Sequence, residues 1–318
     1  MEMSNRVYGV IGISSIMANW NADFSGYPKT TYGGEVFGSD KALKYPMKKM
    51  WEEQGEKELY IKSMTVNEGK KGEVSIIPRT LSERYEYIFG IPVAKEKGNG
   101  REVLKNLFNA IDVKNFGATF AEEGNNVAIT GAVQIGQGFN KYDGHNAFEQ
   151  PILSPFRDPK AAAKDHDNEE AKNSTLGTKI LSDEAHYFYS FAINPKAYDN
   201  FVAMEVTDGY EDEDYDAFKQ AALTSATSFA TNSKIGCENE FGMFVETEDD
   251  MYLPNLAEYV EFSKGDEKNI IEIKCGDMLK DSADRIKSIE IYYNPFTTEL
   301  KSNVDGAKLF DIRTLKEV

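Results

Sequence analysis

Residues 112–140 read DVKNFGATFAEEGNNVAITGAVQIGQGFN, a run in which a strand-like pattern leads into two closely spaced glycines. In its second half, apolar side chains recur at alternate positions, at Val127, Ile129, Val133 and Ile135. The residues between them are small or polar, so the segment has one apolar face. A period of two is typical of a half-buried β-strand, and we therefore expect one strand from residue 127 to residue 135.

Gly136 and Gly138 follow this strand directly. Glycines permit backbone conformations that are closed to other residues, so the chain can turn sharply here and approach a ligand that lies across it. The backbone of a polyanion is one candidate ligand, and a tight hairpin exit without any ligand is the alternative. A dinucleotide-binding loop is excluded, because the third glycine of that motif would fall at Lys141.

The chain has 318 residues, of which 41% are hydrophobic and 12% aromatic, enough to form the core of one large domain or two. No apolar run approaches the ~18–20 residues of a membrane span, and the N-terminus lacks the pattern of a secretion signal. We therefore expect a cytoplasmic protein. Cys237 and Cys275 are isolated in the sequence, and a reducing compartment would leave them as free thiols.

The net charge of −17 argues against a simple nucleic-acid binder, because such proteins are usually basic. The charge is unevenly distributed along the chain. Residues 39–105 contain fourteen Lys and Arg against eleven Asp and Glu, a balance of +3, which leaves −20 for the remainder. If the protein binds RNA, its first third offers the better surface.

Residues 6–16 alternate as a strand does, and residues 19–31, NWNADFSGYPKTT, are dense in turn-forming residues. We therefore expect a strand followed by a loop at the strand's end, where functional residues tend to collect. In this loop Trp20 is suited either to stacking on a base or to anchoring the loop in the core.

Ser39 and Asp40 form a helix-capping signal before KALKYPMKKMWEEQG, in which Lys44 and Lys48 lie one turn apart on one face. Pro46 fits comfortably only in a first turn, so the helix is expected to begin near Tyr45. Phosphate contact is one function of this lysine face, and a solvated surface is the alternative.

Residues 58–66 and 73–81 are expected to form a hairpin with a basic tip. Residues 145–176 show little apolar periodicity and are expected to be a long insertion without regular structure. His166 lies there between two aspartates, but we assign no metal to it, because such clusters in polar runs are usually solvated. Seven acids in residues 205–216 do not match the EF-hand spacing and are expected to lead into a helix over residues 215–232.

Several segments resemble, in the same order, the backbone subunit of CRISPR Cascade surveillance complexes in its type I-B form. They are YGVIGISSIMANWNADFSGYPKTT (8–31), GSDKALKYPMKK (38–49), DVKNFGATF (112–120), ITGAVQIGQGF (129–139), STLGTKILSDEAHYFYSFAIN (174–194) and DAFKQAALTSATSFATNSKIGCENEFGMFVE (216–246). The resemblance implies an α+β fold, a modified RNA-recognition-motif (ferredoxin-like) palm with an antiparallel sheet, plus finger and thumb insertions. It implies one domain spanning residues 1–318, with the finger near residues 55–100 and a thumb-like loop at residues 145–176.

The function that the resemblance implies is that of a non-catalytic subunit whose copies form a helical oligomer along a guide RNA. Such a subunit binds the RNA phosphate backbone and supports pairing of the guide with target DNA in antiviral defence. The implied partners are the guide RNA, the target DNA strand, copies of the chain, and the cap, large and guide-processing subunits of Cascade, with no membrane and no cofactor. Together with the patterns above, the resemblance places RNA binding at Asn19, Asn21, Lys44, Lys48, Lys49, Gln134, Gly136, Gln137, Gly138 and Phe139.

Two other functions stay open. Related backbone subunits of RNA-targeting CRISPR complexes cleave RNA with a loop aspartate, and Asp23 is the first residue to test for such metal-dependent cleavage. An acidic scaffold that binds no RNA is favoured by the net charge. Because the sequence shows no nucleophile triad, metal-ligand pair or phosphate loop, we expect a protein without catalytic or metal-binding residues.

Overall fold

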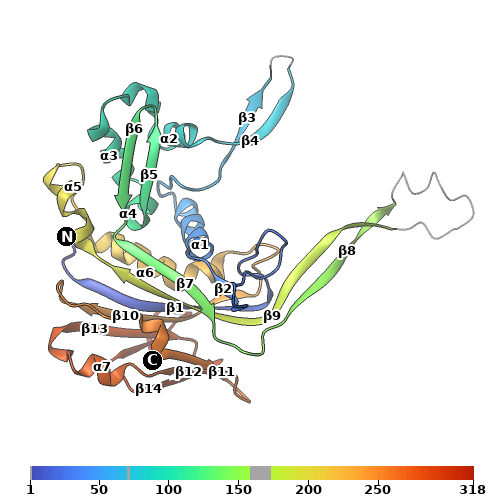
Figure 1. Cartoon of the computed structure of the whole chain (residues 1–318), viewed down its shortest axis with the longest axis vertical. Helices are drawn as coiled ribbons and strands as arrows, with labels where there is room; N and C mark the ends of the chain where they lie inside the picture. The colour runs from blue at the N-terminus through green and yellow to red at the C-terminus, as the bar shows by residue number, and fades with distance from the viewer. Residues whose placement is uncertain (1, 70–71, 158–172) are drawn as a thin grey trace, which may run out of the picture.

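The computed structural model describes residues 2–69, 72–157 and 173–318, and within them the largest sheet has nine strands (Figure 1). Its centre consists of four strands in the spatial order β10 (Cys237–Thr247), β1 (Arg6–Ala18), β9 (Asn173–Ile193) and β7 (Val133–Asn140). Short strands extend it on both sides, β2 (Phe37–Gly38) beyond β7, and β13 (Ile286–Tyr293), β15 (Lys308–Asp311) and β16 (Lys316–Glu317) beyond β10. The paired strands of this sheet are antiparallel, except that β13 and β15 are parallel.

Strand β1 lies in the middle of this sheet and is buried on both faces. Val7, Ile11 and Ile13 belong to one hydrophobic core, whereas Tyr8 and Val10 belong to another. The strand predicted for residues 6–16 is therefore confirmed, together with the division of its side chains between two faces. A central strand of this kind requires packed elements on both sides of the sheet.

Two helices, α1 (Asp40–Glu53) and α6 (Asp212–Ser228), pack together over one face of the sheet. Helix α1 buries Leu43, Met47 and Trp51 against this face. Helix α6 buries Phe218 and Ala222, and begins three residues before the predicted start because Glu211 caps it. The acids of its first turn complement the positive end of the helix dipole.

The prediction that α1 begins near Tyr45 is wrong, since Pro46 lies inside the helix. Ser39 caps the helix by accepting a hydrogen bond from the backbone N–H of Ala42 at 3.3 Å. An interior proline removes one backbone hydrogen bond and destabilises a helix by about 3 kcal/mol. The cap and the burial of the apolar stripe, which includes the Pro46 ring, offset that loss.

The other face of the large sheet carries a second, three-stranded sheet and a short helix, at the bottom of Figure 1. These elements are β11 (Val260–Ser263), β12 (Asn269–Ile273), β14 (Thr298–Ser302) and α7 (Gly276–Lys280). The short helices η3 (Leu256–Tyr259) and η4 (Ala283–Arg285) complete this part of the chain, whereas η2 (Pro195–Tyr198) and α5 (Asp199–Ala203) contribute Tyr198 and Phe201 to the core on the side of α1 and α6. Among the described residues, no helix has the length and apolar character needed to cross a membrane.

An outgrowth separates α1 from β7 and projects from the sheet in Figure 1. It contains β3 (Met64–Glu68), β4 (Val74–Pro78), α2 (Leu81–Phe89), η1 (Val93–Glu96), α3 (Gly100–Phe108), α4 (Ile111–Phe116), β5 (Gly117–Glu122) and β6 (Asn125–Thr130). Strands β3 and β4 pair as the predicted hairpin, with shorter strands than expected, and residues 70 and 71 at its tip lie outside the described residues.

The single strand predicted for residues 127–135 is wrong. Strand β6 ends at Thr130 and pairs with β5 in the outgrowth, whereas β7 begins at Val133 and joins the large sheet. The break lies at Gly131, where a side chain would collide with the backbone of Phe116 and Gly117. Alternation of apolar residues therefore continues across two strands that belong to different sheets.

Strands β8 (Ala147–Arg157) and β9 form a second projecting hairpin, at the right of Figure 1. The prediction that residues 145–176 lack regular structure is wrong for the strand residues 147–157 and 173–176. Residues 158–172, which include His166, lie outside the described residues.

Candidate nucleic-acid interface

The loop between β1 and β2, residues 19–36, is fastened to the sheet at its first two residues. Asn19 is buried, and its side-chain amide donates to the carbonyl oxygens of Gly26 (2.9 Å) and Ile180 (3.2 Å). Trp20 is also buried, and its indole N–H donates to the Tyr189 hydroxyl at 2.6 Å. Of the two roles open for Trp20, the structure therefore supports the buried anchor. Asn19, predicted to bind RNA, has its amide group turned inward and holds the loop.

Lys234 completes this anchor from the segment before β10. Its ammonium group donates to the carbonyl oxygens of Asn19, at 2.8 Å, and Trp20. Burial lowers the pKa of Lys234 to about 8, so the lysine is still mostly protonated at neutral pH. The start of the loop is therefore held by an internal cation.

Asn21 links the same loop to helix α1. Its side-chain oxygen accepts a hydrogen bond from the backbone N–H of Ser39, the helix cap, at 2.7 Å. Farther along the loop, the backbone N–H of Lys29 donates to the Asn21 carbonyl at 2.8 Å. The Lys29 ammonium group lies 5.7 Å from the centre of the Phe37 ring, on β2. Asn21 and Lys29 thus lie together beside the N-terminus of α1.

The edge pair β2–β7 brings Phe139 and Gly138 to this place. Phe37 pairs with Phe139, and their ring centres are 6.1 Å apart, while Gly38 pairs with Gly138. A side chain at either glycine would overlap the buried ring of Tyr189. Gly138 is therefore required for packing within the protein, in addition to any contact with a ligand.

Neither the sharp turn nor the hairpin exit considered for Gly136-Gln137-Gly138 is correct, because β7 continues to Asn140. The pairing of β7 with β9 shifts register between Ile135 and Gly138, which is a β-bulge. The bulge leaves the side chain of Gln137 exposed. Bulges redirect side chains at sheet edges, and this one presents Gln137 to the solvent.

Gln134 and Gly136 belong to a different part of the surface. They line a groove of about 330 Å³ together with Ser190 on β9 and residues 253–256 before η3. The Gln134 amide donates to the carbonyl of Gly131 at 2.8 Å. The structure therefore does not bring Gln134 together with Asn21 and Phe139, which lie toward the other end of β7.

Lys44 lies one turn inside α1. Its ammonium group pairs with Asp40 at 3.1 Å and lies 5.0 Å from the centre of the Phe116 ring. Much of the Lys44 side chain is covered, but its acidic partner is partly open to solvent, with 27% of the Asp40 side chain exposed. Lys49, farther along, pairs with Glu52 at 2.7 Å and is also half-buried.

Lys48 is enclosed by the outgrowth. Its ammonium group contacts Asp112 at 3.0 Å, Glu58 at 3.3 Å and the Tyr60 carbonyl at 3.1 Å. The side chains of Asp112 and Glu58 are only 1% and 0% exposed. The backbone N–H groups of Leu59 and Tyr60 donate to the same Asp112 carboxylate, at 2.9 and 2.8 Å.

The two carboxyl groups in this network ionise differently. Burial and the neighbouring Asp112 carboxylate raise the pKa of Glu58 well above its usual range. Burial alone would also raise the pKa of Asp112, but the Lys48 charge and hydrogen bonds hold that pKa below its usual value. The network therefore favours ionised Lys48 and Asp112 and disfavours the ionised form of Glu58, and Lys48 serves as an internal link between α1 and the outgrowth.

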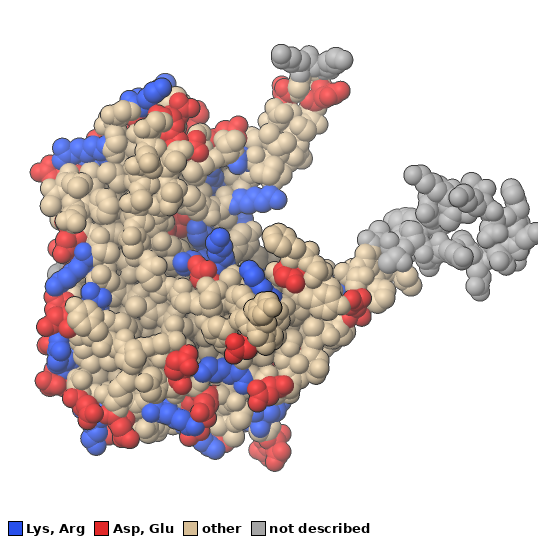
Figure 2. All heavy atoms as spheres, in the orientation of Figure 1, with Lys and Arg blue, Asp and Glu red and all other residues tan. Residues whose placement is uncertain are grey.

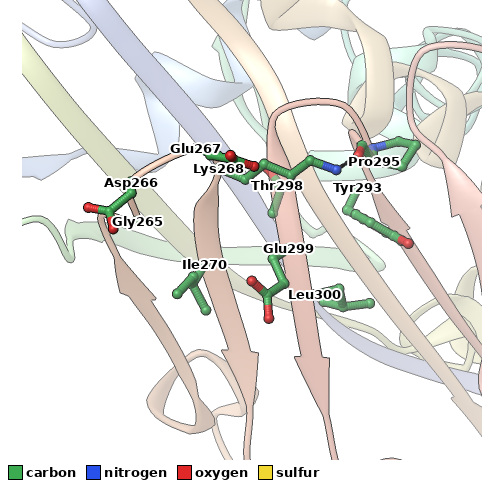
Figure 3. A pocket seen from close by; sticks show the side chains of 10 residues that line it. All are labelled: Gly265, Asp266, Glu267, Lys268, Ile270, Tyr293, Pro295, Thr298, Glu299 and Leu300. Carbon is green, nitrogen blue, oxygen red and sulfur yellow. Dashed lines mark hydrogen bonds between the residues drawn. The ribbon is translucent and has the colours of Figure 1, made fainter.

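Figure 2 shows several Lys and Arg side chains in the hollow between the two projecting hairpins, whereas acidic side chains are frequent along the left and lower borders of the same view. A pocket of about 540 Å³ lies elsewhere, at one end of the three-stranded sheet (Figure 3). Asp266, Glu267 and Glu299 line it, and the Lys268 ammonium group donates to the Pro295 carbonyl at 2.7 Å. This acidic lining does not suit a polyanion.

Three further residues that suit a nucleic-acid surface were not singled out by the sequence patterns. Lys29, Phe24 and Tyr32 lie on the same loop as Asn21, and both aromatic side chains are exposed. The turn-forming residues around each aromatic, DFSG and YGG, were the available signal, since residues at turn tips point outward.

The fold resembles those of chains in solved CRISPR complexes. A chain of a "CRISPR RNA-guided surveillance complex, pre-nicking" has a TM-score of 0.54 and 14% identity, with 98% of both chains covered. A chain of a "CRISPR RNA-guided surveillance complex" has a TM-score of 0.45 and 14% identity, with 91% of both chains covered. No curated protein matches the sequence. The family model described as "CRISPR-associated protein Cas7" matches residues 5–288. The chain therefore belongs to the Cas7 family of CRISPR-associated proteins.

Proposed function

We propose that this protein is a non-catalytic backbone subunit of a type I-B Cascade complex, several copies of which assemble along one guide RNA. The observation that carries the proposal is the surface formed by the loop 19–36, the N-terminal half of α1 and the β2–β7 edge. It gathers Asn21, Lys29 and Phe139 beside the start of α1, with Lys44 one turn along that helix, and α1 and β2 lie between the two projecting hairpins in Figure 1. Amide and ammonium groups next to an exposed ring fit the phosphates and bases of a single strand.

The order of the elements supports an RNA-recognition-motif palm. Strand β1, helix α1, strands β7 and β9, helix α6 and strand β10 follow one another as β-α-β-β-α-β, with further elements inserted. In space the four strands lie in the order β10, β1, β9, β7, with both helices on one face, which is the ferredoxin-like arrangement. In this proposal the outgrowth between α1 and β7 is the finger, and the β8–β9 hairpin is the thumb.

The position of the proposed RNA-binding surface is compatible with the net negative charge of the chain. The chain carries a net charge of −17, so binding to RNA requires that cations be concentrated locally. Lysines and arginines in the hollow provide this, and the acidic borders of the same face remain available for solvent or for neighbouring subunits. Target DNA then joins by pairing with the bound guide, and the sequence is chosen by base pairing rather than by the protein.

For the non-catalytic part of the proposal, the support comes from Asp23. Its carboxylate oxygen Oδ1 accepts hydrogen bonds from the backbone N–H of Ser25 (2.8 Å), the Ser25 hydroxyl (2.7 Å) and the backbone N–H of Tyr27 (3.1 Å). The Ser25 hydroxyl, with these backbone donors, lowers the pKa of Asp23. This aspartate closes its own turn, which is a structural task.

The test is to purify the protein alone and with a guide transcript, and to record particle size and the ratio of absorbance at 260 and 280 nm. We expect a free monomer without guide and a large RNA-containing particle with it. The variant Lys29→Ala/Lys44→Ala should lose this assembly at physiological salt, whereas the charge-matched control Lys280→Ala/Lys301→Ala, on α7 and β14, should keep it. A wild-type protein that stays monomeric with guide would refute the proposal.

A further inference from the structure

Two aromatic side chains of the loop 19–36 point fully into solvent. Relative to an extended reference, Phe24 is 113% exposed and Tyr32 is 111% exposed, so the part of the chain that the structure describes covers neither ring. A single exposed apolar side chain is common on protein surfaces and by itself indicates nothing. The surroundings of these two rings therefore decide what they mean.

The backbone beneath each ring is held in a closed turn. Below Phe24, the Asp23 hydrogen bonds described above and the bond from the Asp23 N–H to the Tyr27 carbonyl (2.8 Å) close the first turn. Gly26 completes it with a φ of 91°, a conformation that favours glycine. The ring of Phe24 is thus presented outward by a fixed backbone.

A second turn presents Tyr32 in the same way. The backbone N–H of Thr31 donates to the Glu35 carbonyl (2.8 Å), and the N–H of Gly34 donates to the Thr31 carbonyl (3.0 Å). The Thr31 hydroxyl accepts from the Glu35 N–H at 3.2 Å, and Gly34 has a φ of 89°. Hydrogen-bonded turns therefore hold both rings in exposed positions, and their exposure does not result from a loop without internal hydrogen bonds.

We infer that Phe24 and Tyr32 are stacking platforms for unpaired bases of the bound RNA. The inference rests on the proposed function, since it names the part of the RNA that this loop contacts. Asn21, just before the first turn, fastens the loop to the cap of α1, and Lys29, between the two turns, lies over the Phe37 ring. Lys29 is five residues from Phe24 and three from Tyr32, so a phosphate bound at Lys29 lies against the loop that presents both rings.

A base is a better occupant than a second copy of the chain. Stacking needs one exposed ring face, whereas a stable protein interface needs a continuous patch, with about 1,000 Å² buried in total. The neighbours of the two rings are Asp23, Ser25 and the pair Gly33-Gly34, which are polar or without side chains. The two rings are therefore isolated from each other, and within the described loop no continuous apolar patch connects them.

The experiment measures binding of the full chain to two probes, a single-stranded RNA and an oligomer of the same length with abasic sites throughout. The variant Phe24→Leu/Tyr32→Leu keeps apolar side chains but removes the rings. For the RNA we expect affinity to fall about 5- to 150-fold for each lost stack, with an unchanged salt dependence. For the abasic probe we expect equal affinities of variant and wild type, and Phe24→Tyr/Tyr32→Phe should bind RNA as the wild type does.

The matched control is Tyr252→Leu/Phe296→Leu, which removes two aromatics that are 72% and 67% exposed on other parts of the surface. This control should bind RNA as the wild type does. Wild-type affinity of the Phe24→Leu/Tyr32→Leu variant for RNA would overturn the inference while leaving the proposed function intact. An equal loss on both probes would assign the rings to contacts between copies and would also overturn it. If the wild type bound neither probe, the proposed function itself would fail.

Discussion

Two lysines of helix α1 lie one turn apart, and their surroundings differ in kind. Lys44 pairs with Asp40 of the same helix, a carboxylate that remains partly open to solvent. Lys48 pairs with Asp112 and Glu58, two carboxyl groups from the outgrowth that are shut away from solvent. The difference shows that helical spacing places two lysines on a common face without indicating what later covers that face.

The comparison separates the two predicted phosphate contacts. A phosphate at Lys44 competes with a partly exposed i,i+4 ion pair, and helix pairs of this spacing are worth only about 0.3–0.5 kcal/mol. A phosphate at Lys48 would have to displace a buried Asp112 carboxylate that also accepts two backbone hydrogen bonds. We therefore assign Lys44 to the RNA interface and Lys48 to the joint between α1 and the outgrowth.

The largest expected effect is that of Lys48→Met on stability. Removing the ammonium group leaves the Asp112 carboxylate buried without its cation, and breaking a buried pair in this way typically lowers the unfolding free energy by about 3–5 kcal/mol. Urea unfolding at neutral pH measures the change. Lys49→Met is the control, because its pair with Glu52 is more exposed and is worth about 0–1 kcal/mol. If the two substitutions lowered the unfolding free energy equally, Lys48 would behave as a surface lysine and the assignment to a buried ion pair would be wrong.

His186 is another buried basic side chain, and it extends the comparison because its charge is lost as pH rises. His186 is buried, and its Nδ1 contacts Glu240 at 2.8 Å while its Nε2 contacts Glu184 at 3.0 Å. Burial alone would lower the pKa of His186, but these two carboxylates raise it above the usual 6.5. His186 is therefore a packed side chain whose two carboxylate neighbours favour its charged form.

For His186 the expected outcome is a stability contribution that depends on pH. Because the folded-state pKa lies above the unfolded one, the contribution is complete below about pH 6.5 and is lost as pH rises through the folded-state value. Unfolding curves of wild type and His186→Gln should differ by about 1.5–3 kcal/mol at low pH and converge at high pH. The Lys48→Met difference should stay constant over the same range, since the pKa of Lys48 is raised above 10.5. A constant His186 difference would contradict the assignment.

Elements with local signals could be predicted from the sequence. Alternation identified β1, the Ser39 cap identified α1, and the acidic lead identified α6. The loop after β1 was located by its turn-forming residues, and Asn21, whose contact with RNA stays a prediction, lies beside the cap of α1. In each of these cases the deciding residues are within a few positions of one another.

Features decided by distant contacts could not be predicted. No residue near Gly131 in the sequence indicates that the backbone of Phe116 and Gly117 lies against it. At this contact, one alternating run of residues is divided between two sheets. Gly138 looked like part of a ligand loop, but the ring beneath it belongs to Tyr189. Burial of Lys48 likewise depends on an outgrowth whose path the helix sequence does not encode.

The smallest expected effect belongs to Lys44→Ala, and it tests the surface side of the comparison. Its stability change should be about 0.3–0.5 kcal/mol, because only one partly exposed pair with Asp40 is lost. Its effect on RNA binding should appear in the salt dependence, since each phosphate contact to a single strand contributes about 0.7 to the slope of log K against log salt. Titrations at several salt concentrations with two unrelated RNAs should show a slope smaller by about 0.7 for both, because phosphate contacts carry no base information. Lys280→Ala, on a lysine that is farther from the interface, should leave the slope unchanged. An unaltered slope for Lys44→Ala would make Lys44, like Lys48, a residue of the protein's own structure, and the path of the RNA would then have to follow Lys29 and the loop alone.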